Sequence, residues 1–180
     1  MNAVTINEQR LYLLLGNHTT APMLELVAQT ALRGPVRILD GSNSCNVFDI
    51  AHRLRRETPL IYPALGRIYL ARAFTCYEMV TLITNAAADG IPTLLPGLLA
   101  TFYDEDVPLE ETQRLLRSCL LALHALCVSQ PVVISASPPN QRIADRMALL
   151  ETLVDAADQT ISLQETPETK KVETQLHLPF

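Results

Sequence analysis

The acidic residues offer the first candidates for chemistry. Asp104, Glu105 and Asp106 are consecutive, and neighbouring carboxylates of this kind can hold a divalent cation. The same residues directly precede Pro108 and a long helix-like segment, where negative charge suits the positive end of the helix dipole. This position favours an acidic lead-in to the helix over a metal cluster, and we expect no metal site.

A second candidate is the polar stretch around Asp40. Asp40 ends the apolar run VRILD, and Ser42, Asn43 and Ser44 follow it. A carboxylate beside hydroxyl and amide groups at the end of a strand can contact a ligand. Asp40, Ser42 and Asn43 are therefore a candidate ligand loop, with an ordinary polar turn as the simpler alternative.

The other nucleophiles and bases form no catalytic pattern. His18 has no nucleophile near it in the sequence, and Ser135 and Ser137 lack the G-x-S-x-G pattern of hydrolases. No pair of histidines has the spacing of metal ligands. The cysteines form no CxxC pair, so we expect reduced, buried thiols. They are Cys45, Cys76, Cys119 and Cys127.

The densest basic stretch is HRLRR, which contains Arg53, Arg55 and Arg56, with Arg67 following later. Because arginine pairs well with phosphate, these three residues are candidate contacts to DNA or to a partner. A solvated helix face is the simpler alternative. The nearby aromatic residues fit a core pattern better than a stacking platform for bases. They are Tyr62, Tyr69, Phe74 and Tyr77.

Strand-like and helix-like segments alternate along the chain. The expected strands cover residues 11–15, 36–40, 67–71, 93–95 and 131–135, and the expected helices cover 22–32, 47–56, 75–85, 108–126 and 141–157. Residues 160–164 and 172–178 are expected to form a terminal hairpin, joined by the polar stretch 165–171. Repeated β–α units with apolar strands predict a largely parallel sheet that is covered by helices on both faces.

In folds of this class, ligands bind at the carboxyl ends of the strands. The loops of interest therefore begin at Gly16, Asp40, Pro96 and Ser135.

Several segments resemble the ATPase core of the RecA/RadA recombinase family. RIYLARAFTCYEMVTLI (residues 67–83) is similar to the family's strand, its ARAF turn and the following helix. LLPGLLATFYDED (94–106) resembles the apolar strand that ends in an aspartate, and PVVISAS (131–137) resembles the strand that carries a polar sensor. The resemblance spans about residues 9–178. It implies one RecA-like α/β domain over residues 1–180, a three-layer sandwich with a mostly parallel central sheet and a C-terminal hairpin.

The stretch that matches the family's phosphate-binding loop keeps only its first glycine. It reads Gly16, Asn17, His18, Thr19, Thr20, Ala21, Pro22 and Met23. Pro22 replaces the lysine and removes a backbone N–H, and Met23 replaces the hydroxyl that holds Mg²⁺.

The family's other two catalytic positions are also changed. Pro96 stands at the strand-end aspartate, and a serine or asparagine after Asp40 replaces the glutamate that activates water. Neither a hydroxyl nor an amide accepts a proton from water near neutral pH. We therefore expect no ATPase activity by the family's mechanism, no catalytic residue and no cofactor.

The resemblance implies a non-catalytic accessory or scaffold subunit in DNA recombination or repair. Its partner would be a RecA/RadA-type protein or a second copy, in a dimer or hetero-complex rather than a filament, because only the short segment 1–9 precedes the first strand. One alternative is a nucleotide-binding protein or NTPase with an unconventional site that uses Asp40, Asn43 and residues 104–106. Another is a protein-interaction module unrelated to DNA.

Composition narrows the class of protein further. The chain has 180 residues and a formal net charge of −5, with 48% hydrophobic and 18% charged residues. This hydrophobic content argues against a disordered chain, and the acidic balance makes any DNA contact weak or indirect. No apolar stretch approaches the roughly 20 residues of a membrane span, and no secretion signal is visible in the first ten residues. We therefore expect a cytoplasmic protein that does not contact membranes.

Overall fold

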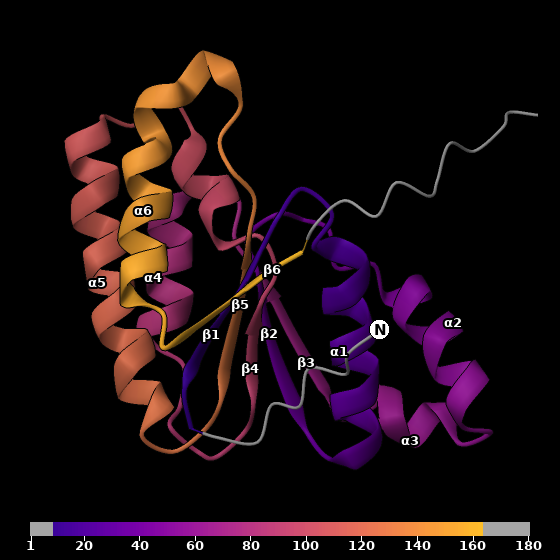
Figure 1. Ribbon diagram of the computed structural model, residues 1–180. Coiled ribbons are helices and arrows are strands. Elements are labelled where there is room, and N and C mark those ends of the chain that lie inside the picture. Colours follow the sequence, from indigo (N-terminus) through magenta and orange to yellow (C-terminus); the bar gives the residue numbers. More distant parts are fainter. Residues whose placement is uncertain (1–8, 164–180) are drawn as a thin grey trace, which may run out of the picture.

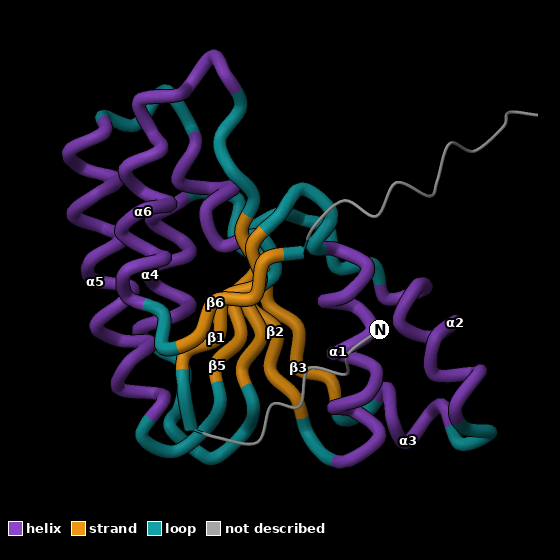
Figure 2. The backbone as a smooth tube through the Cα atoms, in the orientation of Figure 1, coloured by secondary structure: helices purple, strands orange, loops and turns teal. Residues whose placement is uncertain are grey.

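The computed structural model describes residues 9–163 and has an α/β architecture around one parallel sheet. The strands are β1 (Leu11–Leu15), β2 (Val36–Asp40), β3 (Ile68–Arg72), β4 (Thr93–Leu95), β5 (Val132–Ala136) and β6 (Gln159–Ser162). Their order in the sheet is β3-β2-β4-β5-β1-β6, and every pairing is parallel. The carboxyl ends of all six strands therefore lie at one end of the sheet, where the loops gather (Figure 2).

Helices cover both faces of this sheet, which makes three layers. One face carries α1 (Thr20–Arg33), α2 (Val47–Glu57) and α3 (Ile61–Leu65). The other carries α4 (Cys76–Thr84), α5 (Leu109–Cys127) and α6 (Met147–Ala156) (Figure 1). Two 3₁₀ helices, η1 (Leu98–Tyr103) and η2 (Gln141–Arg146), lie before α5 and α6. The expected three-layer α/β class is confirmed.

Local signals in the sequence account for where several helices begin. Thr75 caps α4 by accepting the backbone N–H of Glu78, and the Glu78 carboxylate accepts the N–H of Thr75 in return. Asn46 caps α2 by accepting the N–H of Phe48. Helix α1 begins two residues before Pro22, because proline is tolerated throughout a first turn whose N–H groups have no partner within the helix.

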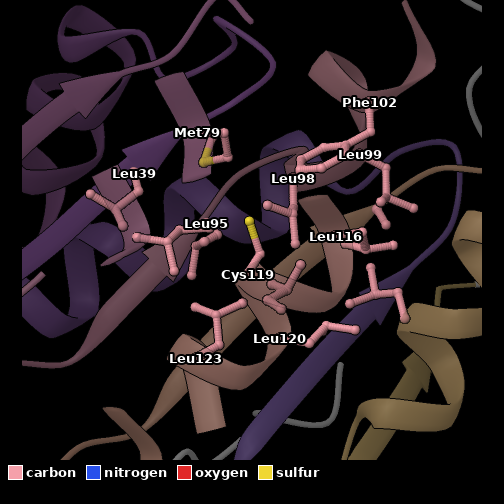
Figure 3. Packing of buried hydrophobic residues seen from close by; sticks show 14 of the residues in the cluster. Leu39, Met79, Leu95, Leu98, Leu99, Phe102, Leu116, Cys119, Leu120 and Leu123 are labelled. Carbon is pink, nitrogen blue, oxygen red and sulfur yellow. The ribbon is translucent and has the colours of Figure 1, made fainter. Parts of the chain in front are cut away.

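Alternating side chains divide the core into two clusters, one on each face of the sheet. On β1, Leu11 and Leu13 face the α4–α6 side, whereas Tyr12 and Leu14 face the α1–α3 side. Figure 3 shows Met79 of α4 and residues of α5 such as Cys119 and Leu123 meeting in the first cluster. Because both faces of the strands are covered, the strands are apolar almost throughout.

All four cysteines are buried and form no disulfide, which confirms the prediction of reduced thiols. Burial raises the pKa of Cys45 to about 11, of Cys119 to about 12 and of Cys127 to about 11, against a usual value of 9.0. These thiols are therefore protonated near neutral pH and offer no nucleophile.

The end of the described chain extends the sheet. The predicted strand at 160–164 is observed as β6, which pairs in parallel with β1. The second predicted strand, 172–178, and the polar connection, 165–171, lie outside the described residues. The single helix predicted over 141–157 is wrong: η2 and α6 replace it, and Ile143 has non-helical angles (φ −116°, ψ 38°).

The prediction that four aromatic residues belong to the core is also wrong. Tyr62, Tyr69, Phe74 and Tyr77 are all exposed, with Tyr62 at 82% and Phe74 at 70% of their full accessible area. For Tyr69 the physical reason is that β3 is an edge strand, so no further strand of the described chain pairs with its outer side. None of the helices within residues 9–163 has the length and apolarity needed to cross a membrane.

Candidate functional site

A cavity of about 470 Å³ lies at the carboxyl ends of the strands. The loops that follow β1, β2, β4 and β5 converge on it, although they are far apart in the sequence. Most of its polar groups are hydroxyls. They come from Thr19, Thr20, Ser42, Ser44, Ser135 and Ser137.

The loop after β1 is held tightly by its neighbours. The N–H of Gly16 donates to the carbonyl of Ala136 (3.1 Å), and Ser137 Oγ donates to the carbonyl of Gly16 (2.9 Å). Gly16 has φ +153°, and a Cβ at this position would lie 2.7 Å from the carbonyl oxygen of Leu163. A glycine is therefore required here, because the chain after β6 leaves no room for a side chain. Asn17 lines the cavity, and His18 is exposed beside it.

The start of α1 faces the cavity with Thr19 and Thr20. Thr19 stands at the cap position, yet its hydroxyl caps no N–H of the helix. The residue is only 6% exposed and lines the cavity. Pro22 has no N–H, and Met23 is buried in the core on the α1 face. Met23 therefore points away from the cavity.

Asp40 organises the loop after β2. Its side chain is fully buried. Oδ1 accepts the N–H groups of Ser42 (3.2 Å) and Ser44 (3.3 Å). Oδ2 accepts the N–H of Cys45 (3.0 Å) and Nε of Arg72 (3.3 Å). Both oxygens are thus satisfied by the protein itself.

Of the candidate ligand loop, only Ser42 lines the cavity, and Ser44 joins it there. The two hydroxyls are 2.6 Å apart. Asn43 sits at the exposed tip of the loop in the left-handed conformation (φ 53°) and does not line the cavity. Asp40 and Asn43, which the unconventional NTPase site would need, are thus not brought into the cavity.

A turn at Pro96 and Gly97 follows β4, where the resemblance would place a strand-end aspartate. The carbonyl of Pro96 accepts the N–H of Gly41 (3.0 Å), and the N–H of Gly97 donates to Ser135 Oγ (3.0 Å). Gly97 has φ +59°, and a Cβ there would lie 2.3 Å from Cβ of Ser42. Sequence reasoning missed this close approach, for which the Pro-Gly pair is the available signal.

The acidic stretch contributes one residue to the cavity, Glu105. Asp104 instead accepts the N–H of Asp106 (3.0 Å) in the turn that leads to α5, as the interpretation of a helix lead-in predicts. Tyr103 also lines the cavity, donates to the carbonyl of Ser137 (2.9 Å), and has its pKa raised by burial. Within the described chain, no three His, Cys, Asp or Glu side chains gather in a way that could hold a metal.

The cavity is therefore polar but nearly uncharged. Its described lining contains hydroxyls, the amides of Asn17 and Asn140, and Glu105, but no lysine or arginine. Such a lining can hydrogen-bond to a neutral polar ligand. It lacks the cations that stabilise the charge of a transferring phosphoryl group.

The basic stretch is divided by the fold. Arg53 Nη1 pairs with Glu25 Oε2 (3.0 Å) and so ties α2 to α1. Arg67 donates to the carbonyls of Ala31 (3.2 Å) and Leu32 (3.0 Å) at the end of α1. Arg55 and Arg56 are exposed and have no hydrogen bond or ion pair to the described residues.

Comparisons of the chain with protein-family models and with curated proteins find no match.

Proposed function

We propose that this chain is a non-catalytic RecA/RadA-like protein that acts as an accessory or scaffold subunit in DNA recombination or repair. Its partner would be a RecA/RadA-type protein or a second copy of the chain. The resemblance of residues 67–83, 94–106 and 131–137 to that family supports the assignment of the family. The chemistry of the cavity supports the loss of catalysis.

One observation carries the proposal. The cavity lies at the strand ends where the resemblance expects the reaction, yet no described cation lines it. Phosphoryl transfer depends on positioning and on stabilising charge, and the described lining offers hydroxyls, two amides and one carboxylate, Glu105, but no cation and no group of side chains that could hold a metal. Asp40, the carboxylate retained from the resembled site, is fully buried and bonded to its own loop. The loop after β2 thus has a structural role but no catalytic group, which is what we expect of a scaffold subunit.

A nucleotide-binding protein without hydrolysis is the second candidate, and the start of α1 favours it. The Thr19 hydroxyl caps no N–H of this helix, and Thr19 lines the cavity of about 470 Å³. A polar ligand placed there would hydrogen-bond to this hydroxyl and to the first N–H groups of the helix. Because the described lining lacks lysine and arginine, such a ligand would be held by hydrogen bonds and not by charge pairing.

A thermal-shift titration with ATP and ADP, each with and without Mg²⁺, separates the two candidates. An intact RecA-type ATPase serves as the positive control. We expect no shift at millimolar nucleotide and no phosphate release. A ligand present at 100 times its Kd would add about 2.7 kcal/mol to the free energy of unfolding, so binding would be easy to see.

A saturable shift that Thr19→Val abolishes would establish nucleotide binding, because valine keeps the shape of threonine and removes only the hydroxyl. Phosphate release above that of the protein-free control would contradict the non-catalytic proposal.

A further inference from the structure

The lining of the cavity at the carboxyl ends of the strands is divided between two kinds of side chain. Its serine and threonine hydroxyls come from the start of α1, from the loop after β2 and from the carboxyl end of β5. Its large apolar groups come from the two 3₁₀ helices: Leu99 and the ring of Tyr103 from η1, and Ile143 from η2. A ligand that fits this cavity therefore needs polar groups and an apolar face together.

The polar groups of the lining offer donors and acceptors side by side. Ser135 is only 2% exposed, and its Oγ accepts the N–H of Gly97 (3.0 Å), so the hydroxyl keeps a hydrogen to donate. Ser137 Oγ donates to a backbone carbonyl of the loop after β1 (2.9 Å), so it keeps lone pairs that can accept. Asn140 Oδ1 accepts a backbone N–H of η2 (2.9 Å), which leaves the NH₂ group of this side chain to donate.

This mixture of donors and acceptors indicates the chemistry of the ligand. Phosphates and carboxylates only accept hydrogen bonds, and ammonium groups only donate them, so each would pair with part of the lining alone. A hydroxyl group both donates and accepts. The lining therefore favours a ligand that carries several hydroxyl groups.

The charge of the cavity favours an uncharged ligand. Glu105 is the one charged side chain of the described lining. Its two oxygens can accept from adjacent hydroxyls of a ligand, whereas they repel a phosphate. No lysine or arginine of the described lining offsets this repulsion. The ligand class thus differs from the nucleotide that the resemblance expects.

We propose that the cavity binds an uncharged sugar or cyclic polyol of about the size of a monosaccharide. Its hydroxyls would pair with Glu105, Asn140 and the serine hydroxyls, and the C–H face of its ring would lie against Tyr103 and Ile143. The face of an aromatic ring is electron-rich and attracts such hydrogens. The cavity volume of about 470 Å³ lies within the range of small-molecule sites, about 300–1,000 Å³.

The inference goes beyond the proposed accessory role and does not rest on it, because only the lining of the cavity is used. The two fail separately. Loss of the sugar proposal would leave the search for a recombinase partner unaffected, and a protein without such a partner could still bind a sugar.

The test is a titration of the purified, ¹⁵N-labelled full chain, followed by the amide shifts in ¹⁵N–¹H correlation spectra. The uncharged probes are D-glucose, D-ribose and myo-inositol. The charged probes are glucose 6-phosphate and spermidine. We expect saturable, millimolar binding of at least one uncharged probe, with the largest shifts at amides of the lining such as Gly97 and Ser137. Glucose 6-phosphate should bind about threefold more weakly than glucose because of Glu105.

Two substitutions assign the binding to the cavity. Glu105→Gln should weaken the uncharged probes by about threefold and remove the disadvantage of the phosphate. Glu110→Gln is its control, because Glu110 is exposed on α5 and does not line the cavity. Ala100→Phe should abolish binding, because Ala100 is exposed and lines the cavity, so the added ring enters it without disturbing the core. Ala125→Phe, at an exposed position of α5, is the matched control.

The dispersion of the same spectra shows that each variant is folded. Three results would overturn the proposal: no saturable binding of any of the three uncharged probes, tighter binding of glucose 6-phosphate than of glucose, or unchanged binding in a folded Ala100→Phe variant. The second result would assign the cavity to anionic ligands. Saturable binding of spermidine without any binding of the sugars would assign it to cations, and would equally overturn the proposal.

Discussion

Asp40 and Arg72 end neighbouring parallel strands at the same register position, and Nε of Arg72 donates to Oδ2 of Asp40 at 3.3 Å. The carboxylate is fully buried, whereas the arginine side chain is 36% exposed. Arg72 also donates from Nη2 to the carbonyl of Cys45. One ion pair thus joins the ends of β2 and β3 and holds the loop that forms one wall of the cavity.

Asp40→Ala should lower the free energy of unfolding by at least about 3 kcal/mol. The substitution leaves several buried N–H groups and one cation without their acceptor, and each such loss costs about 1–3 kcal/mol. Arg72→Ala should lower the free energy of unfolding by less than Asp40→Ala does, because the arginine side chain is partly solvated. Urea unfolding of both variants measures the difference. An Asp40→Ala variant as stable as the wild type would show that the carboxylate does not hold the loop.

Gly97→Ala should destabilise the protein through both conformation and contact. Gly97 has φ +59°, which alone costs an alanine about 1–2 kcal/mol, and the new Cβ would lie 2.3 Å from Cβ of Ser42. Gly90→Ala is the matched control, since Gly90 also has a positive φ (+81°) but nothing within 4 Å of the added atom. The larger loss should appear in Gly97→Ala by urea unfolding. If both variants lost the same free energy of unfolding, the turn after β4 would be able to move, and the close approach of Gly97 to Ser42 would not be required.

Arg146→Ala should destabilise the connection between η1 and α5. The side chain is buried, and its guanidinium donates to the carbonyls of Phe102 (2.8 Å) and Val107 (2.7 Å) and to Thr112 Oγ1 (3.3 Å). Removal leaves these buried acceptors unpaired, so we expect a loss of about 2–4 kcal/mol. Arg146→Lys should recover only part of it, because an ammonium lacks the planar fork.

Arg142→Ala is the control for Arg146, because Arg142 is exposed on the same 3₁₀ helix. Thermal unfolding should leave this variant close to the wild type. A similar loss in both variants would assign the effect to η2 as a whole and not to the buried guanidinium.

Stability should fall at high pH because of the buried thiols. The pKa of Cys45 and of Cys127 is raised to about 11 and that of Cys119 to about 12, against 9.0 when the thiols are exposed by unfolding. Below pH 9 the three thiols are protonated in both states, and their contribution to the free energy of unfolding is complete. As the pH rises from 9 toward 11 and 12, this free energy falls by roughly 1.4 kcal/mol per pH unit for each thiol, because the unfolded chain loses the proton first. Urea unfolding between pH 8 and 10.5 measures the slope.

The same thiols should resist alkylation by iodoacetamide in the native protein at pH 8 and react once the chain is unfolded. Rapid native labelling of Cys45 or Cys119 would contradict the burial and the raised pKa values. Replacement of Cys119 by alanine should remove one thiol's share of the pH dependence, which separates this effect from other groups that titrate at high pH.

Local features of the sequence determined the secondary structure of most of this chain. The apolar runs LYLLL and VRILD are observed as β1 and β2 with the predicted bounds, because a strand buried on both faces needs no polar positions. The capping box at Thr75 and Glu78 places the start of α4 from neighbouring residues alone. Parallel pairing followed from the alternation of strands and helices, since a helix between two strands brings the chain back in the same direction.

Only the tertiary structure decided which contacts the side chains of the candidate site make and which side chains are exposed at the β3 edge of the sheet. An apolar run shows that a strand is buried, but it does not show which strand lies at the edge of the sheet. The order of strands in the structure places β3 at the edge, and Tyr69 on this strand is exposed. Asp40 resembled a ligand in the sequence, because its partners Cys45 and Arg72 approach only when two strands pair in register. The hydroxyl cavity likewise exists only where loops separated by many residues meet, and such long-range contacts leave no periodic signal in the chain.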